Sequence, residues 1–73
     1  MVDDILLSMR VSGSHWIIVR IDTATGSESY YMAGTWVSDT RYGKRIQGYG
    51  NALREREKIP DKHGFTYEIR PSD

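Results

Sequence analysis

The chain has 73 residues, no cysteine and zero formal net charge, with ten Lys and Arg against ten Asp and Glu. This length predicts one domain over residues 1–73, whose core alone gives roughly 3–5 kcal/mol of stability, so oligomerisation or a bound partner is expected to contribute. Without cysteine there is no disulfide and no thiolate metal site. Balanced charge also disfavours a general polyanion binder.

The N-terminus favours a cytoplasmic location. Asp3 and Asp4 are acidic where a secretory signal carries positive charge, and the apolar runs are too short to cross a bilayer. The two histidines, His15 and His63, are far apart in sequence and have no obvious acidic companions. We therefore expect no metal, no cofactor and no membrane contact.

Two strands are predicted in the first third of the chain, where apolar and polar residues alternate on either side of a Ser12–Ser14 break. A two-residue loop would bury Arg20 and Asp22, whereas an odd-numbered loop places all the apolar positions on one face. We therefore predict the odd loop. That shared face consists of Ile5, Leu7, Met9 and Val11 with Ile17, Val19 and Ile21.

A third strand is predicted from about Glu28 to Val37, after the turn residues Asp22–Gly26. The turn should contain a local side-chain bond to the backbone and a glycine with positive φ. With a four-residue loop, the positions that continue the Ile17 and Val19 face are Tyr30, Met32, Gly34 and Trp36. Tyr31, Ala33, Thr35 and Val37 then lie on the other face.

A helix and a last strand complete the predicted fold. One helical stripe is formed by Tyr42, Ile46, Tyr49 and Leu53. Three glycines within its span lower helix stability by roughly 3 kcal/mol, so we expect the helix to start late or to bend. The segment with the clearest helical pattern is Asn51–Lys58. Phe65, Tyr67 and Ile69 alternate as a fourth strand at an edge. The expected class is α+β: a small two-layer domain with a three-stranded antiparallel meander, one helix and a fourth edge strand (β-β-β-α-β).

The sheet face opposite the helix is the first candidate binding surface. If Ile17, Val19 and Ile21 face the helix, the other face exposes apolar and aromatic residues rimmed by arginine, a composition typical of protein contacts. Alternatively, the C-terminal segment folds over this face as a second small core. The predicted protein-binding residues are Trp16, Ile18, Arg20, Tyr31 and Arg10.

A basic cluster before the helix is the second candidate. Arg41, Lys44 and Arg45, with Tyr42 among them, oppose the helix dipole if the helix starts there, so an anion, a nucleic acid or an acidic protein surface is a possible ligand. If the helix starts later, the cluster is a solvated loop.

One resemblance covers about half of the chain. The chain resembles the three-stranded DNA-reading modules of the AP2 and integrase arm-binding type. The residues that carry this resemblance are Trp16–Arg20, Thr25-Gly26, Tyr30-Tyr31, Gly34–Trp36, Asp39-Thr40 and a helix with Tyr49, Ala52 and Leu53. That resemblance implies a sheet in the major groove. The first three predicted strands of this chain contain only two basic residues, Arg10 and Arg20.

No nucleophile with a base, ligand cluster or phosphate loop is present, so we expect no enzyme. The leading hypothesis is a small non-catalytic protein-binding module of accessory or inhibitor type, by analogy with those of phages and mobile elements. Its partner is another protein, a second copy of the chain, or both. The alternative is a nucleic-acid-binding module.

Overall fold

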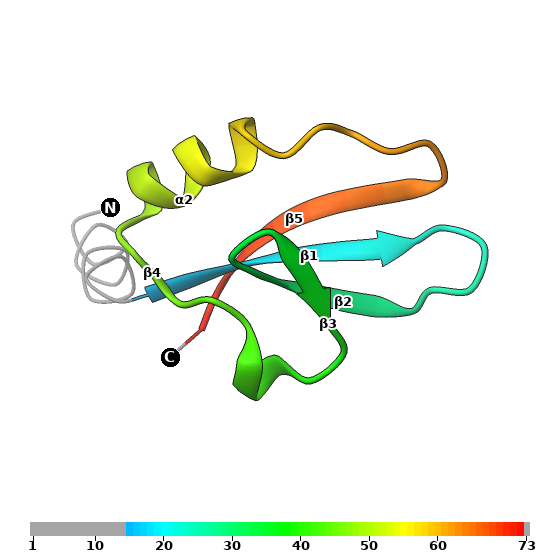
Figure 1. Ribbon diagram of the computed structural model, residues 1–73, viewed down its shortest axis with the longest axis horizontal. Helices are drawn as coiled ribbons and strands as arrows, with labels where there is room; N and C mark the ends of the chain where they lie inside the picture. Colours follow the sequence, from blue (N-terminus) through cyan, green and yellow to red (C-terminus); the bar gives the residue numbers. More distant parts are fainter. Residues whose placement is uncertain (1–14, 73) are drawn as a thin grey trace, which may run out of the picture.

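The computed structural model describes residues 15–72 as five strands, a 3₁₀ helix and an α-helix (Figure 1). The predicted strand over Ile5–Val11 and the candidate residue Arg10 lie outside the described residues. In chain order the elements are β1 (His15–Asp22), β2 (Glu28–Met32), β3 (Thr35–Val37), η1 (Thr40–Tyr42), β4 (Ile46–Gln47), α2 (Tyr49–Glu57) and β5 (Phe65–Pro71).

The central strand of the antiparallel sheet is β1. Along one edge it pairs with β5 from Trp16↔Pro71 to Asp22↔Phe65. Its other edge is shared, because β2 pairs with its C-terminal half and β4 with His15 and Trp16. Figure 1 shows β5 running back beside β1 after a long connection from α2. The predicted class, a meander followed by a helix and a final edge strand, is confirmed, although the meander is β1–β2–β3.

Two tight turns set which residues share a face. The Asp22 carboxylate accepts a hydrogen bond from Ala24 N–H, and Gly26 has a φ of 78°, so the predicted chemistry of this turn is confirmed. A second turn was not predicted: Ala33 and Gly34 both have positive φ and join β2 to β3 as a two-residue hairpin. It reverses the chain within the segment predicted as one strand. Trp36 therefore pairs with Tyr31, and the prediction that it continues the Tyr30 face is wrong.

The helix starts late, as the glycines suggested, and occupies Tyr49–Glu57. The segment before it contains η1 and β4 instead of a bent helical turn. Gly43 is buried here because the chain passes close to Tyr30, and a Cβ at this position would lie 3.1 Å from the Tyr30 Cβ. The predicted apolar stripe is not the packed face: Tyr49 and Leu53 are exposed, whereas Ala52 is fully buried.

The two faces of the sheet have separate apolar clusters. On the helix side, Ile18 and Ile46 pack against Ala52 of α2, and the residues packed around these three are Trp16, Tyr31, Trp36, Ile59 and Ile69. The opposite face holds Ile17, Val19 and Tyr30, with Ile21 and Val37. The prediction that Ile17, Val19 and Ile21 face the helix is therefore wrong, as is the prediction that Val37 shares a face with Tyr31. Both faces of β1 are apolar, so alternation alone did not determine which one α2 covers.

No helix within residues 15–72 is long and apolar enough to span a membrane.

Candidate functional site

On the sheet face that α2 covers, which we call the helix-side face, aromatic and cationic side chains gather between Ile18 and the C-terminal end of β1. We call Arg20, Trp36, Phe65 and Tyr67 the aromatic–arginine cluster. All four are half-buried, unlike Ile18, which is fully buried beneath α2. The cluster therefore lies on the sheet but is only partly covered.

Strand register brings these residues together. Arg20 pairs with Tyr67, and two residues further along β1 Asp22 pairs with Phe65. Because paired residues of antiparallel strands share a face, as do residues two apart on one strand, Arg20, Phe65 and Tyr67 all face the same way. The Ala33–Gly34 turn adds Trp36, which it places opposite Tyr31 on this face. Three separate strands thus contribute to the cluster.

The Arg20 guanidinium contacts two rings at once. Its central carbon lies 4.5 Å from the Trp36 ring centroid and 4.4 Å from that of Phe65. Such contacts are attractive because the electron-rich face of an aromatic ring favours a cation. Its Nε atom is buried and has no hydrogen-bond partner, and within residues 15–72 no carboxylate pairs with this side chain. Arg20 is therefore held by rings while its strong donors lack acceptors.

The rings also contact one another. Trp36 packs edge-on against Tyr31 at 5.6 Å and in a tilted arrangement against Tyr67 at 5.9 Å between centroids. Tyr67 in turn lies under the Arg56 guanidinium of α2, 4.3 Å from the ring centroid. This continuous series of contacts fixes the rotamers around Arg20. The cluster is preorganised before any ligand arrives.

Other charges around the cluster are unevenly paired. Arg56 bonds the carboxylate of Asp61 and the carbonyl oxygen of Ile59, so its donors have acceptors. The Lys62 ammonium lies 5.8 Å from the Phe65 ring centroid, and among the described residues it has no ion-pair partner. Asp22, at the end of β1, accepts its bond from the turn backbone. Arg20 and Lys62, against the single carboxylate of Asp22, leave this end of the face with an excess of positive charge.

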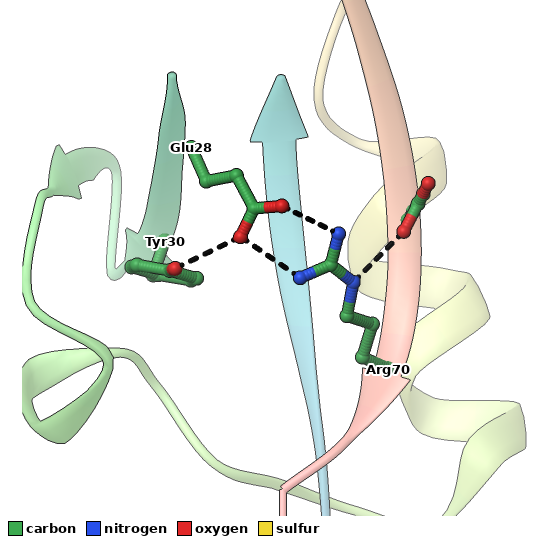
Figure 2. Close-up of polar contacts among 4 residues, drawn as sticks. Glu28, Tyr30 and Arg70 are labelled. Carbon is green, nitrogen blue, oxygen red and sulfur yellow. Dashed lines mark hydrogen bonds and ion pairs between the residues drawn. The ribbon is translucent and has the colours of Figure 1, made fainter. Parts of the chain in front are cut away.

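The opposite face contains an arginine in a very different setting. Arg70 on β5 reaches across β1 and donates two hydrogen bonds to the Glu28 carboxylate, at 2.9 and 2.8 Å (Figure 2). Its Nε donates to Glu68 at 2.8 Å, and the Tyr30 hydroxyl donates to Glu28 at 3.0 Å. We call these four residues the Arg70 clamp. It joins β2 to β5 over the fully buried Val19.

Ionisation in the clamp follows these bonds. The hydrogen bonds from Arg70 and then from Tyr30 lower the pKa of Glu28 below its ordinary value of 4.5. Burial, followed by the bond to Glu28, raises the pKa of Tyr30 above 10.0. The two carboxylates raise the pKa of Arg70, which therefore stays charged. Each charged group of the clamp therefore has a partner within it, with two carboxylates sharing one guanidinium.

Beside the clamp is a hollow of about 600 Å³ that contains part of the predicted basic cluster. The residues lining it are Ile17, Tyr30, Thr40, Arg41, Arg45, Arg70, Pro71 and Ser72. Arg41 is tied to Asp39 through a bond of 2.7 Å, which lowers the pKa of that carboxyl, and Arg70 belongs to the clamp. The hollow is basic in composition, but at least two of its arginines already have carboxylates.

The predicted anion-binding residues do not form one site. Arg41 and Arg45 line the hollow, whereas the Lys44 ammonium turns to the helix and lies 3.7 Å from the Glu55 carboxylate. Tyr42 is 58% exposed, and its ring centroid lies 5.6 Å from the Arg41 guanidinium carbon. The structure thus divides this cluster between the two sides of the sheet.

The predicted protein-binding residues are separated by burial. Ile18 belongs to the core under α2, and Trp16 is half-buried with its ring edge-on against Tyr49 at 4.9 Å. The helix covers both positions, so the prediction that Ile18 belongs to an open contact surface is wrong. Arg20 belongs to the aromatic–arginine cluster, and Tyr31 lies beside it in contact with Trp36. Two described members of the predicted set have a buried donor without a hydrogen-bond partner within residues 15–72: the Nε of Arg20 and the Nε1 of Trp16.

Sequence reasoning missed Trp36, Phe65 and Tyr67 as site residues. Trp36 was assigned to the wrong face because the Ala33–Gly34 turn was overlooked, although a glycine between two β-rich segments is a signal for a hairpin. Phe65 and Tyr67 were identified as a strand without a known neighbour. Their pairing with β1 is a long-range contact that alternation does not specify.

The side chains of the cluster are of types that bind ligands. Rings and a guanidinium recognise flat, apolar and anionic groups, whereas the cluster itself contains no carboxylate, imidazole or thiol. Within residues 15–72, no group of three His, Cys, Asp or Glu side chains is placed to hold a metal ion.

Comparison with known proteins adds no family to these observations: no family model, no curated protein and no solved structure matches this chain. The resemblance to three-stranded DNA-reading modules stays a prediction.

Proposed function

We propose that this chain is a non-catalytic protein-binding module of accessory or inhibitor type, and that it contacts its partner through the aromatic–arginine cluster. The observation that carries the proposal is Arg20: its guanidinium is held between two half-buried rings without any acceptor from the described chain. A cytoplasmic location is part of the same proposal and is supported by the absence of cysteine.

The residue types of the cluster support protein binding over other uses. Trp, Tyr and Arg contribute most often to the binding energy of protein interfaces, because they bury large, stiff surfaces and donate strong hydrogen bonds. Trp36 and Tyr67 are held by contacts with other rings and Phe65 by contact with Arg20, so binding orders few side chains. Arg20 has no hydrogen-bond acceptor among the described residues, so an acceptor on a partner adds charge-assisted bonds that the free protein lacks.

The test is capture of partners by matched variants. Tagged wild-type protein, Arg20→Met and Phe65→Leu are incubated with lysate of the source cells, and the captured proteins are quantified by mass spectrometry. Arg54→Met is the control, because Arg54 is exposed on α2 and bonds Asn51, which is not a cluster residue. We expect at least one protein to be captured equally by wild type and Arg54→Met and to be lost from both cluster variants.

Folding is verified for each variant by circular dichroism. If no protein shows this dependence on Arg20 and Phe65, the cluster is not the contact surface and the proposal fails. Light scattering of the purified protein covers the case in which the partner is a second copy. A dimer that dissociates in both cluster variants supports the proposal with the chain as its own partner.

A nucleic acid is the second candidate, because half-buried rings beside cations also stack on unpaired bases. Fluorescence anisotropy with labelled single-stranded and duplex DNA at low salt tests it. Binding that weakens steeply with salt and requires Arg20 and Phe65 favours this candidate. The balanced charge of the chain favours the protein partner.

A further inference from the structure

The surroundings of Arg20 also indicate what the partner must present. The Trp36 and Phe65 ring centroids lie 4.5 and 4.4 Å from the Arg20 guanidinium carbon, so these rings limit access to the guanidinium. A ligand therefore reaches its N–H donors from the edge of the guanidinium plane. Nε is its buried donor without a partner. The two Nη nitrogens are not buried in that way, so they remain within reach of a ligand. An acceptor must therefore approach them at the edge of the guanidinium.

The nearby acidic residues are already engaged. Asp61 bonds Arg56, and Asp22 caps its own turn. Glu68 lies on the opposite face, bonded to Arg70. Two cations that contact the Phe65 ring, Arg20 and Lys62, have no carboxylate partner within the described part of the chain. A partner that complements these two cations must therefore carry negative charge.

From this geometry we infer that the aromatic–arginine cluster binds an acidic segment of a partner protein, with one Asp or Glu carboxylate accepting two hydrogen bonds from Arg20. This inference rests on the proposed function and adds the chemistry of the partner. A planar carboxylate matches the fork of a guanidinium, and neighbouring rings exclude water, which strengthens charge-assisted hydrogen bonds. Lys62 is placed to attract a second acidic residue of the same segment.

Peptide selection tests the inference without knowledge of the natural partner. A phage library of random dodecapeptides is selected on wild-type protein, Arg20→Met and Arg54→Met. We expect wild type and Arg54→Met to enrich peptides with Asp or Glu at one position, and Arg20→Met to lose that enrichment. Absence of enriched peptides, or the same acidic enrichment on Arg20→Met, overturns the inference.

The selected peptide then gives a direct readout. It is synthesised with its acidic residue and with the matching amide, Asn or Gln. We expect the acidic form to bind wild type about tenfold or more tightly than the amide, with a smaller ratio for Arg20→Lys, which keeps the charge and loses the fork. In ¹⁵N NMR spectra the Arg20 Nε–H resonance should shift with the acidic peptide only.

Equal affinity of the acid and amide forms overturns the inference. If such peptides still depend on Phe65, the cluster remains a protein-binding surface and the proposed function stands. If the Arg20 Nε–H resonance responds to single-stranded DNA and to no acidic peptide, the nucleic-acid candidate replaces both proposals.

Discussion

Arg20 and Arg70 lie on opposite faces of the same small sheet and differ in nearly every interaction. Arg70 bonds two carboxylates of its own chain and joins β2 to β5 (Figure 2). Arg20 contacts two rings and has no carboxylate within residues 15–72. An arginine whose acceptors come from its own fold stabilises that fold. One that is positioned without acceptors is available to a ligand.

The same contrast explains how each face is covered. Among residues 15–72 no α-helix covers the face with Val19, and the Arg70 clamp, η1 and the nearby loop lie above its apolar residues. On the helix side, α2 covers Ile18 and stops short of complete cover over the aromatic–arginine cluster. The open surface therefore lies at one end of the helix-side face instead of across the whole opposite face.

The largest expected effect tests which face contains the packed core. Ile18→Ala should lower the free energy of unfolding by about 2–5 kcal/mol, because it leaves a cavity at a position with no exposed surface. Ile21→Ala, on the opposite face and half-buried, should cost clearly less. Urea unfolding of both variants measures the difference. Equal losses would contradict the placement of α2 over Ile18.

The second prediction uses acid to distinguish the two arginines. The folded-state pKa of Glu28 is lowered, so its contribution to stability is complete above 4.5 and is lost as the pH falls through the lowered value. Below pH 4.5, the urea concentration at the unfolding midpoint should therefore fall less steeply with decreasing pH for Glu28→Gln than for wild type. Arg20→Met should keep the wild-type slope, since no carboxylate within residues 15–72 pairs with Arg20. An unchanged slope in Glu28→Gln would argue against the clamp.

The third prediction concerns the turn that sends Trp36 to the Arg20 face. Gly34→Ala should cost about 1 kcal/mol, because Gly34 has a φ of 90° and an L-residue is strained there, although no atom obstructs the Cβ. Ala33→Asn should raise the free energy of unfolding by roughly 0.5 kcal/mol, because asparagine tolerates positive φ in such turns. Thermal unfolding resolves both signs. A loss in Ala33→Asn would argue against this turn geometry.

The sequence predicted the fold class and the local turn and helix structure better than it predicted which sheet face each side chain occupies. The Asp22–Gly26 turn, the late start of the helix and the last strand all follow from local residue preferences, and the structure bears them out. The choice of face for α2 does not, because Ile17 and Ile18 are equally apolar. A missed hairpin at Ala33–Gly34 also changed the face of Trp36. An error of this kind moves every later residue of a strand.

The candidate site was predicted only in part for the same reason. Arg20 and Tyr31 were identified as an aromatic and basic surface, whereas Trp36, Phe65 and Tyr67 join them through pairing across three strands. Whether an arginine has an acceptor also depends on long-range contacts: Glu28 and Arg70 are 42 positions apart in the chain. The sequence presents Arg20 and Arg70 as similar residues.

The most direct test of the account measures Arg20→Met and Arg70→Met side by side, for urea unfolding and for partner capture. Arg20→Met should lose the partner and keep the wild-type free energy of unfolding within about 0.5 kcal/mol, because the lost ring contacts are offset by removal of a buried donor without an acceptor. Arg70→Met should keep the partner and lose about 1 kcal/mol, since its side chain is partly exposed. The opposite pattern, or loss of the partner in both folded variants, would contradict the division between a structural and a binding arginine.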